Sequence, residues 1–412
     1  MIRPNDRGRK VLLAVILSAT VTFMSACVVR PVEKLSVTRE SETISDVPEE
    51  TQTENMPSSV RAEPGSSGNL ADADRILSYM NSVEYHGVVL VARGGEVIFE
   101  GAYGYSDRRE KTANRADTVF ELGSITKQFT AVAIMMLVEQ GKLSLDDPLS
   151  LYIPEYPYAE GITVRNLLNM TSGIPDYVTC GALGLGLEDL DTASVETIEQ
   201  VKSIIQKDYS HAGMVESMKD YALLFEPGEE YSYSNTNYYF LGIVIEKLSG
   251  MSYFDFVEAN FFEPLQMNSA STDPSVLTSK GAVLLQNGAI YLPSQNRTLS
   301  YAAGSIVSDA RDLLKWEQAV MDGAFLSDDG WTQVFDPGDF DYGFGWSVGS
   351  GTYYHGGQTV GYNTHVMIEP ESETVIIALS NTQGSDHYFS GEKVRSDRVV
   401  FEIYSLLELS ED

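Results

Sequence analysis

Two side chains that could carry out acyl transfer stand three positions apart in the stretch Ser124-Ile125-Thr126-Lys127. A serine hydroxyl is a weak nucleophile until a neighbouring base removes its proton. A lysine amine could be that base if its pKa, about 10.4 in water, were lowered. If the stretch starts a helix, both side chains share one face. The spacing therefore predicts Ser124 as a nucleophile and Lys127 as its proton acceptor.

The segment after this pair is apolar on nearly all sides, which predicts a helix buried inside a domain. It runs over residues 128–138, and Gly141 supplies a stop signal. Burial and the positive end of the helix dipole would both lower the lysine pKa, and free N–H groups of the first turn could face a developing oxyanion. Ser390 and Lys393 have the same spacing but precede a charged stretch that offers no desolvation. The spacing alone is therefore weak support.

Two further motifs lie far downstream. In Tyr233-x-Asn235 a phenol and a carboxamide would face one side of an extended segment. A tyrosine beside a lysine cation would have its pKa lowered, and the two would titrate as a coupled pair. His355 is followed by Gly356 and Gly357 among strand signals, and these glycines would let a substrate approach the backbone closely. The ordered set predicts one site assembled from three segments.

The N-terminus has the pattern of an export signal, with a basic start and an apolar stretch over residues 11–23 that is short for a membrane span. Cys27 follows small residues, as in the lipobox of bacterial lipoproteins, so residues 1–27 are interpreted as a lipoprotein signal peptide with Cys27 as the lipidated residue. An ordinary signal peptide with an incidental cysteine is the alternative. The expected localisation is the cell membrane, lipid-anchored on the extracytoplasmic side.

The next segment and the overall charge limit the partners. Residues 28–69 have no aromatic side chain and are rich in Ser, Thr, Glu and Pro, so they are predicted to form a disordered tether. Cys180 is then the one remaining cysteine, which leaves no intrachain disulfide. A formal net charge of −31 without a basic stripe argues against nucleic acid. The expected partners are a small-molecule or peptide substrate and, through the N-terminal lipid only, a membrane.

Residues 70–412 are predicted to form one domain, with an α/β part over about 70–145 and 300–412 and a helical part over about 146–299. The predicted elements of the α/β part, besides the buried helix, are a helix over 71–83, strands over 87–92, 97–102, 342–346, 353–357, 363–369 and 374–379, and a helix over 393–409. The helical part includes a helix over 238–248 that ends at Gly250. Its acidic stretch 181–219 is interpreted as a surface insertion rather than a mobile flap.

Together the three motifs resemble those of the serine hydrolases related to class C β-lactamases. That family includes D-alanyl-D-alanine carboxypeptidases, D-aminopeptidases and β-lactamase-fold esterases. The resemblance covers about residues 72–410, and its supporting stretches are Phe120 to Ser124, Leu168 to Pro175, Phe225 to Glu229, Pro264 to Met267, Ala303 to Ser305 and Tyr342 to Trp346. It implies an α/β fold of the α+β, β-lactamase/transpeptidase-like type, in which helices flank an antiparallel sheet and a helical domain is inserted.

The resemblance also implies roles for the matching residues, without a cofactor or a metal. They are Ser124 as nucleophile, Lys127 and Tyr233 as proton-transfer pair, Asn235 as anchor of a substrate amide, the backbone N–H groups of Ser124 and Gln358 as oxyanion hole, and Gly356 and Gly357 at the substrate. Two positions depart from the family pattern. Met170 replaces a common histidine, and His355 stands where β-lactamases carry lysine.

These departures bear on the substrate. A histidine, with a reference pKa of about 6.5, is mostly neutral at pH 7 and would hold a β-lactam carboxylate poorly, unless neighbouring carboxylates keep it protonated. The predicted function is hydrolysis of esters or of D-amino-acid-containing peptides and amides through an acyl-enzyme, in a cell-wall context. The alternatives are a true β-lactamase and a sensor that binds penicillin or cell-wall peptides without turnover. A Ser-His-Asp hydrolase is disfavoured, because Ser124 does not lie in a G-x-S-x-G elbow and the one such match, at residues 345–349, is followed by strand signals rather than by a helix. A zinc enzyme is disfavoured, because the sequence has no H-E-x-x-H.

Overall fold

The computed structural model describes residues 58–61, 67–183, 195–285, 288–384 and 391–408. The predicted signal peptide, with Cys27, lies outside the described residues. The tether prediction is wrong at its C-terminal end, because Ser58–Arg61 form strand β1 and helix α2 begins at Ser67. Within the described ranges, no helix has the length and apolar character needed to cross a membrane.

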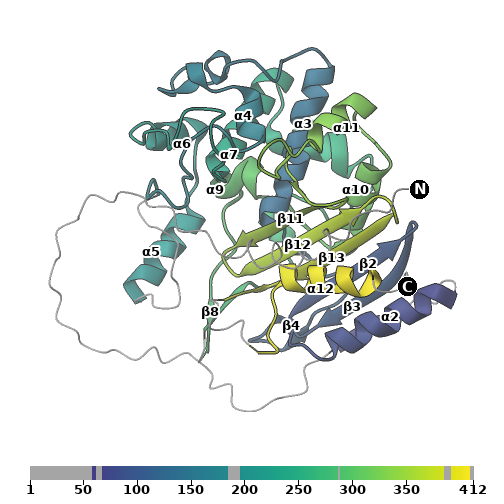
Figure 1. Cartoon of the computed structure of the whole chain (residues 1–412). Helices are drawn as coiled ribbons and strands as arrows, with labels where there is room; N and C mark the ends of the chain where they lie inside the picture. The colour runs from purple at the N-terminus through teal and green to yellow at the C-terminus, as the bar shows by residue number, and fades with distance from the viewer. Residues whose placement is uncertain (1–57, 62–66, 184–194, 286–287, 385–390, 409–412) are drawn as a thin grey trace, which may run out of the picture. The chain divides into compact units, whose positions relative to one another are not determined.

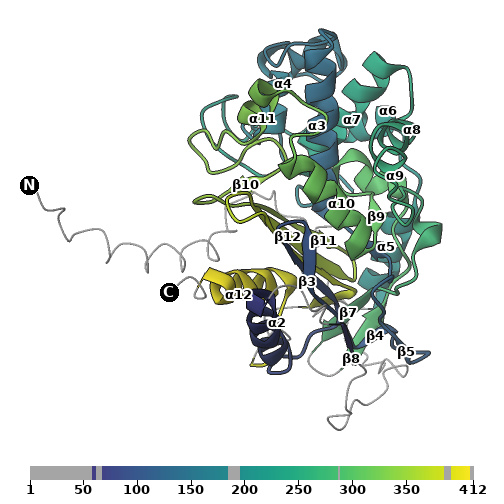
Figure 2. The same ribbon diagram turned by 90° about the vertical axis from the view of Figure 1, so that its right-hand side faces the viewer.

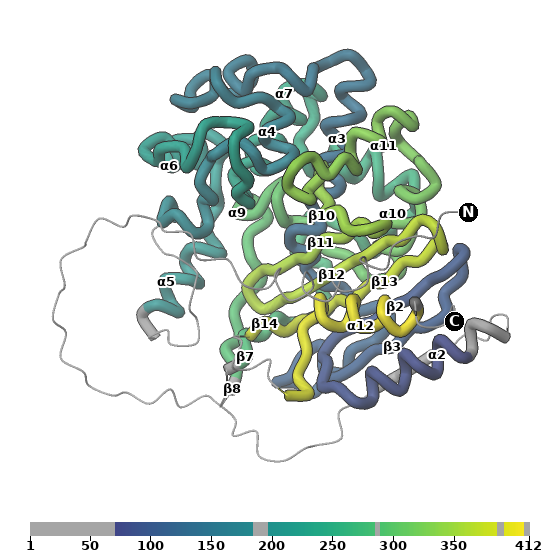
Figure 3. The backbone as a smooth tube through the Cα atoms, viewed as in Figure 1, coloured from purple at the N-terminus to yellow at the C-terminus, as the bar shows by residue number. Residues whose placement is uncertain are grey.

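A seven-stranded antiparallel sheet brings the two ends of the domain together (Figure 1). Its strands are Ser58–Arg61 (β1), Gly87–Arg93 (β2), Glu96–Tyr103 (β3), Ser347–Val348 (β10), Tyr353–Thr359 (β11), Tyr362–Glu369 (β12) and Thr374–Ser380 (β13). Their spatial order is β1-β3-β2-β13-β12-β11-β10. The N-terminal hairpin therefore pairs with a C-terminal strand through β2 and β13, and Figure 3 shows these distant segments side by side.

Both faces of this sheet are covered, which explains why its central strands are apolar throughout. Successive side chains of a strand point to opposite faces. In β2, Val88 and Leu90 enter the large core shared with most of the helices, whereas Val89 and Val91 enter a second core beneath α2 (Ser67–Met80) and α12 (Ser396–Glu408). Figure 2 shows α2 and α12 on one side of the sheet and the other helices on the opposite side.

The remaining helices pack around the predicted buried helix. They are α3 (Thr126–Glu139), α4 (Val164–Leu168), α5 (Val195–Gln206), α6 (His211–Met218), α7 (Asn235–Ser249), α8 (Tyr253–Val257), α9 (Arg297–Ser300), α10 (Ala310–Met321) and α11 (Asp328–Val334). Most side chains of α3 are buried, as its all-round apolar sequence predicts. The predicted stops are confirmed, since Gly141 and Gly250 follow α3 and α7 with φ of +67° and +74°.

Residues 342–346 do not form the predicted strand. Tyr342 makes an isolated bridge with Ser347, and the residues between them turn. Gly345 explains the turn: its φ is +85°, and a Cβ atom there would lie 2.8 Å from the carbonyl oxygen of Lys127. The segment is therefore bent against the start of α3.

The part predicted as helical also differs from expectation. Ala282–Leu285 (β7), Gly288–Tyr291 (β8) and Thr382–Gly384 (β14) form a separate three-stranded sheet. The interpretation of 181–219 as a surface insertion is wrong for its helices, because Ile205 of α5 and Met218 of α6 are buried in the large core. Residues 184–194 lie outside the described ranges.

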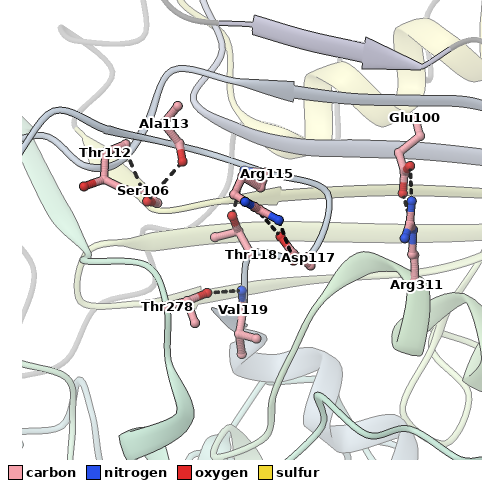
Figure 4. A network of polar contacts seen from close by, with 10 residues as sticks. All are labelled: Glu100, Ser106, Thr112, Ala113, Arg115, Asp117, Thr118, Val119, Thr278 and Arg311. Carbon is pink, nitrogen blue, oxygen red and sulfur yellow. Dashed lines mark hydrogen bonds and ion pairs between the residues drawn. The ribbon is translucent and has the colours of Figure 1, made fainter.

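Polar contacts tie the N-terminal strands to the segments around them (Figure 4). On α10, Arg311 donates through Nε and Nη2 to the two carboxylate oxygens of Glu100 on β3, at 2.7 and 2.6 Å. The Glu100 side chain is buried, so this bidentate pair fixes α10 against the sheet. The backbone N–H of Val119 donates to the hydroxyl of Thr278 at 2.8 Å. This second contact anchors the chain just before it reaches Ser124.

Candidate active site

Ser124 lies in a short 3-10 turn, Gly123–Ile125 (η1), directly before α3. Gly123 has a φ of +56°, and a Cβ atom there would lie 2.8 Å from the backbone nitrogen of Gln358. A glycine is therefore required by backbone conformation and by close approach. The carbonyl of Leu122 accepts a hydrogen bond of 2.8 Å from the Thr364 hydroxyl on β12. The turn that carries Ser124 thus packs against strands β11 and β12.

Lys127 is fully buried, and its amine points at three oxygen atoms. Nζ donates to Ser124 Oγ at 2.9 Å, to Asn235 Oδ1 at 2.7 Å and to the carbonyl of Ala303 at 2.8 Å. Burial lowers the pKa of Lys127 to about 7, although the carboxylate of Asp176 acts in the opposite direction. Near neutral pH the Lys127 amine is therefore uncharged in a large fraction of the molecules, and in that state it can accept a proton.

Tyr233 donates its phenol hydrogen to Ser124 Oγ at 2.8 Å, and its ring centroid lies 4.9 Å from Lys127 Nζ. The prediction that the lysine lowers the tyrosine pKa is wrong. Burial raises the pKa of Tyr233 well above its ordinary value of 10.0, and the charge of Asp176 adds to this effect. Tyr233 is therefore a neutral hydrogen-bond donor to the Ser124 oxygen, and Lys127 is the candidate base.

Asn235 begins helix α7 and uses both ends of its amide. Its Oδ1 accepts from Lys127, and its Nδ2 donates to Asp176 Oδ2 at 2.9 Å. The preceding backbone N–H, of Ser234, lies 3.4 Å from the sulfur of buried Met170. The residue that departs from the family pattern therefore supports the centre of the Tyr233-x-Asn235 motif.

The imidazole of His355 lies beside the Tyr233 ring, with the two ring centroids 6.1 Å apart. Its Nδ1 donates to the carbonyl of Gly356 at 2.6 Å, and the hydroxyl of Tyr342 donates to Nε2 at 3.0 Å. These partners fit a neutral imidazole with the proton on Nδ1. Burial and the Lys127 charge lower the pKa of His355 to about 3, in the direction of the predicted neutral state. Both ring nitrogens are engaged by the protein itself.

The two glycines after His355 lie where the chain itself packs closely. A Cβ atom on Gly357 would lie 1.9 Å from the carbonyl oxygen of Leu122, and one on Gly356 would lie 3.0 Å from Nδ1 of His365. The chain's own packing therefore requires a glycine at position 357 and leaves little room for a side chain at position 356. The close approach of a substrate to these glycines stays a prediction. The exposed Gln358 follows them, with its backbone nitrogen beside Gly123.

Sequence reasoning missed three contributors to this site: the carboxylate of Asp176, the hydroxyl of Tyr342 and the carbonyl of Ala303. Asp176 directly follows the stretch Leu168 to Pro175, which carries the family resemblance. This neighbourhood is the one sequence signal that could have pointed to Asp176 as a site residue. Ser390 lies outside the described residues. Within the described ranges, no group of three or more His, Cys, Asp or Glu residues could hold a metal ion.

Comparisons with known proteins agree with this geometry. The beta-lactamase family model matches residues 74–399. "Penicillin-binding protein 4*" of Bacillus subtilis (strain 168) is 30% identical over 345 residues, which is 77% of this chain and 73% of that protein. A penicillin-binding protein structure from Bacillus halodurans matches with a TM-score of 0.64 at 25% identity, over 81% of this chain and 99% of that chain.

A second solved structure extends the comparison of fold. The D-amino acid amidase from Ochrobactrum anthropi SV3, complexed with L-phenylalanine amide, matches with a TM-score of 0.68 at 23% identity, over 84% of this chain and 99% of that chain. At this identity the match concerns the fold alone. The predicted fold, an antiparallel sheet flanked by helices, is confirmed by these matches.

Proposed function

This chain belongs to the beta-lactamase family, and we propose that it is a serine hydrolase that forms an acyl-enzyme on Ser124. The observation that carries this proposal is the pair of hydrogen bonds at Ser124 Oγ, 2.9 Å from the Lys127 amine and 2.8 Å from the Tyr233 phenol. Esters and D-amino-acid-containing peptides or amides are the proposed substrates, with cell-wall metabolism as the context. The names of the related penicillin-binding proteins and D-amino acid amidase support this choice.

In the proposed acylation, neutral Lys127 takes the proton of Ser124 as Oγ attacks the substrate carbonyl carbon. The Tyr233 phenol donates to the same oxygen and stabilises the charge that develops on it. The substrate oxygen gains negative charge, for which the N–H groups of Ser124 and Gln358 are the proposed donors. The Lys127 ammonium then returns the proton to the leaving group by way of Tyr233. In deacylation, water attacks the acyl carbon and Lys127 takes its proton. The bond to Ser124 Oγ then breaks, and the proton returns to that oxygen.

A substrate panel tests this function. The purified protein is assayed with short-chain p-nitrophenyl esters, with D- and L-alanine p-nitroanilides and with nitrocefin, and its mass is followed during turnover. We expect hydrolysis of esters or of the D-anilide, with a transient acyl adduct. A stoichiometric adduct that never turns over would instead support a sensor, and efficient nitrocefin hydrolysis would support a β-lactamase.

The state of His355 predicts weak activity toward anionic substrates. A charge-assisted hydrogen bond is worth roughly 1.5–3 kcal/mol, so a neutral imidazole in place of a lysine costs on the order of 10- to 150-fold in recognition of a carboxylate. Nitrocefin turnover at pH 7.5 should therefore be feeble and should rise in His355→Lys, with little change in ester turnover. The control is His355→Gln, which stays neutral and should not raise nitrocefin turnover.

The pH dependence of the same assay checks the charge. Because the pKa of His355 lies at about 3, its cation is absent between pH 7.5 and 5.5. The ratio of nitrocefin to ester turnover should stay constant over this range. A ratio that rises on acidification would mean that the imidazole becomes protonated there, and efficient nitrocefin hydrolysis unaffected by His355→Lys would contradict the argument.

We also propose that Cys27 carries the lipid that anchors the protein on the extracytoplasmic side of the membrane. The support is the apolar stretch followed by small residues before Cys27. Cys27→Ser should move the protein from the membrane fraction to the soluble fraction, while Cys180→Ser should leave it in the membrane. A wild-type protein that is soluble and begins at another cleavage site would disprove the anchor.

A further inference from the structure

The carboxylate of Asp176 lies at the edge of the site, in the segment between α4 and α5. Its Oδ2 accepts from Asn235 Nδ2 at 2.9 Å, and its Oδ1 accepts from the backbone N–H of Val178 at 3.0 Å. Burial raises the pKa of Asp176 above its ordinary value of 3.8, and the hydrogen bonds from Val178 and Asn235 and the Lys127 charge act in the opposite direction. Both oxygens face N–H donors, which is the pattern of an ionised carboxylate. Asp176 thus accepts directly from the first residue of α7, and it belongs to none of the three motifs.

The position of this carboxylate is fixed by Thr236 on α7. The Thr236 hydroxyl donates to the carbonyl of Pro175 at 2.7 Å and accepts from the backbone N–H of Tyr177 at 2.9 Å. The residues on either side of Asp176 are therefore held against the helix that begins at Asn235. This arrangement keeps the Asp176 side chain directed at the Asn235 amide.

The carboxylate determines which way the Asn235 amide points. Asp176 can only accept hydrogen bonds, so it faces the NH₂ end of the amide. The carbonyl end then faces Lys127 Nζ, at 2.7 Å. A flipped amide would place its oxygen against the carboxylate and its NH₂ against the lysine amine. The lysine ammonium, which can only donate, favours the same orientation, and Asp176 maintains it when the amine is neutral and has a lone pair that could accept.

The same carboxylate acts on the charge of Lys127. The other titratable groups that face the lysine are Tyr233 and Tyr238, whose ring centroids lie 4.9 and 5.7 Å from Nζ, and His355. Burial raises the pKa of both phenols and lowers that of His355, so all three are neutral at working pH. Asp176 raises the pKa of Lys127 against the effect of burial.

We propose that Asp176 is a positioning residue of the Ser124 site, which orients the Asn235 carbonyl toward Lys127 and supplies the negative charge that acts on the lysine amine. This inference rests on the proposed base role of Lys127. The Asp176 carboxylate then has two separable effects. Orienting the Asn235 amide needs a hydrogen-bond acceptor, whereas acting on the charge of Lys127 needs a negative charge.

Two variants separate these effects. Asp176→Asn keeps an acceptor oxygen but removes the charge, whereas Asp176→Ala removes both. The measurement is the rate of Ser124 acylation by a p-nitrophenyl ester between pH 5 and 9, for which the parent should show an acid limb near pH 7, where Lys127 loses its proton. Without the negative charge the ammonium form is less stable, so the limb should move to lower pH in both variants, by about one unit. The plateau rate should fall less than about tenfold in the asparagine variant and roughly 10- to 100-fold in the alanine variant.

Thr236→Val is the matched control, because it loosens the same segment without changing a charge. It should lower the rate without moving the acid limb. An acid limb that stays at the parental pH in Asp176→Asn would overturn the inference, as would an equal displacement in Thr236→Val.

A readout independent of turnover separates this inference from the proposed function. In protein labelled with ¹³C at lysine Cε, the titration of Lys127, identified from the spectrum of Lys127→Met, should move to lower pH in Asp176→Asn. If the parent forms no adduct at Ser124 but this titration moves, the proposed function fails and the electrostatic role of Asp176 stands. A titration that does not move refutes that role, whatever the enzyme hydrolyses.

Discussion

Replacing Ser124 with alanine is expected to lower kcat by about 10⁴- to 10⁶-fold, the range seen when a hydrolase loses a nucleophile that acts as a unit with its base. The physical reason is that no other hydroxyl among the described contacts receives hydrogen bonds from both Lys127 and Tyr233. The loss should appear in kcat, with KM little changed, because Ser124→Ala removes only a hydroxyl. Intact-mass analysis after a fluorophosphonate probe should show an adduct in the parent and none in the variant.

Ser390→Ala is the matched control for this prediction, because Ser390 has the same spacing to a lysine as Ser124. This variant should keep full activity and full labelling. Labelling that persists in Ser124→Ala, or that disappears in Ser390→Ala, would contradict the assignment of Ser124 as the nucleophile.

Lys127 and Tyr233 are expected to act as one proton-transfer unit. Proton transfer by a positioned side chain typically contributes 10²- to 10⁴-fold, so Lys127→Met and Tyr233→Phe should each lower kcat by about 10³-fold. Methionine keeps most of the volume of the fully buried lysine, and phenylalanine removes only the phenol oxygen. The double variant should lose little more than either single variant, because removing one member already disables the unit.

A double-mutant cycle on kcat measures this coupling. Melting temperatures of the same variants provide the control, since a loss of activity that tracks a loss of folded protein would have a trivial cause. Fully additive losses in well-folded variants would mean that the two side chains act independently. In that case Lys127 would not need Tyr233 to move the Ser124 proton.

Local rules predicted much of the fold. The all-round apolar run after Lys127 predicted a buried helix, and the stop signals at Gly141 and Gly250 were observed at the ends of α3 and α7. Strand signals at 87–92 and 363–369 agree with β2 and β12. These predictions succeed because helix and strand periodicity and the left-handed preference of glycine depend on neighbours in sequence.

The same rules failed where a distant segment determines the local structure. Glycine and aromatic residues alternate over 342–346 as in a strand, but the chain turns at Gly345, where the backbone of Lys127 packs closely against it. Gly357 is a glycine because the carbonyl of Leu122 lies where its side chain would be. A steric requirement that comes from a distant part of the chain leaves no local signal, so neither of these close approaches could be predicted from the sequence.

The sequence by itself determined which side chains are available for chemistry: a serine and a lysine on one face of a helix start, a tyrosine and an asparagine in one motif, and a histidine in place of a lysine. Only the tertiary structure decided their protonation states and their partners. Burial raises the pKa of Tyr233 against the prediction and lowers the pKa of His355, and Asp176 joins the site through Asn235. A pKa depends on the loss of water and on charges brought close by folding, and neither is set by the order of neighbouring residues.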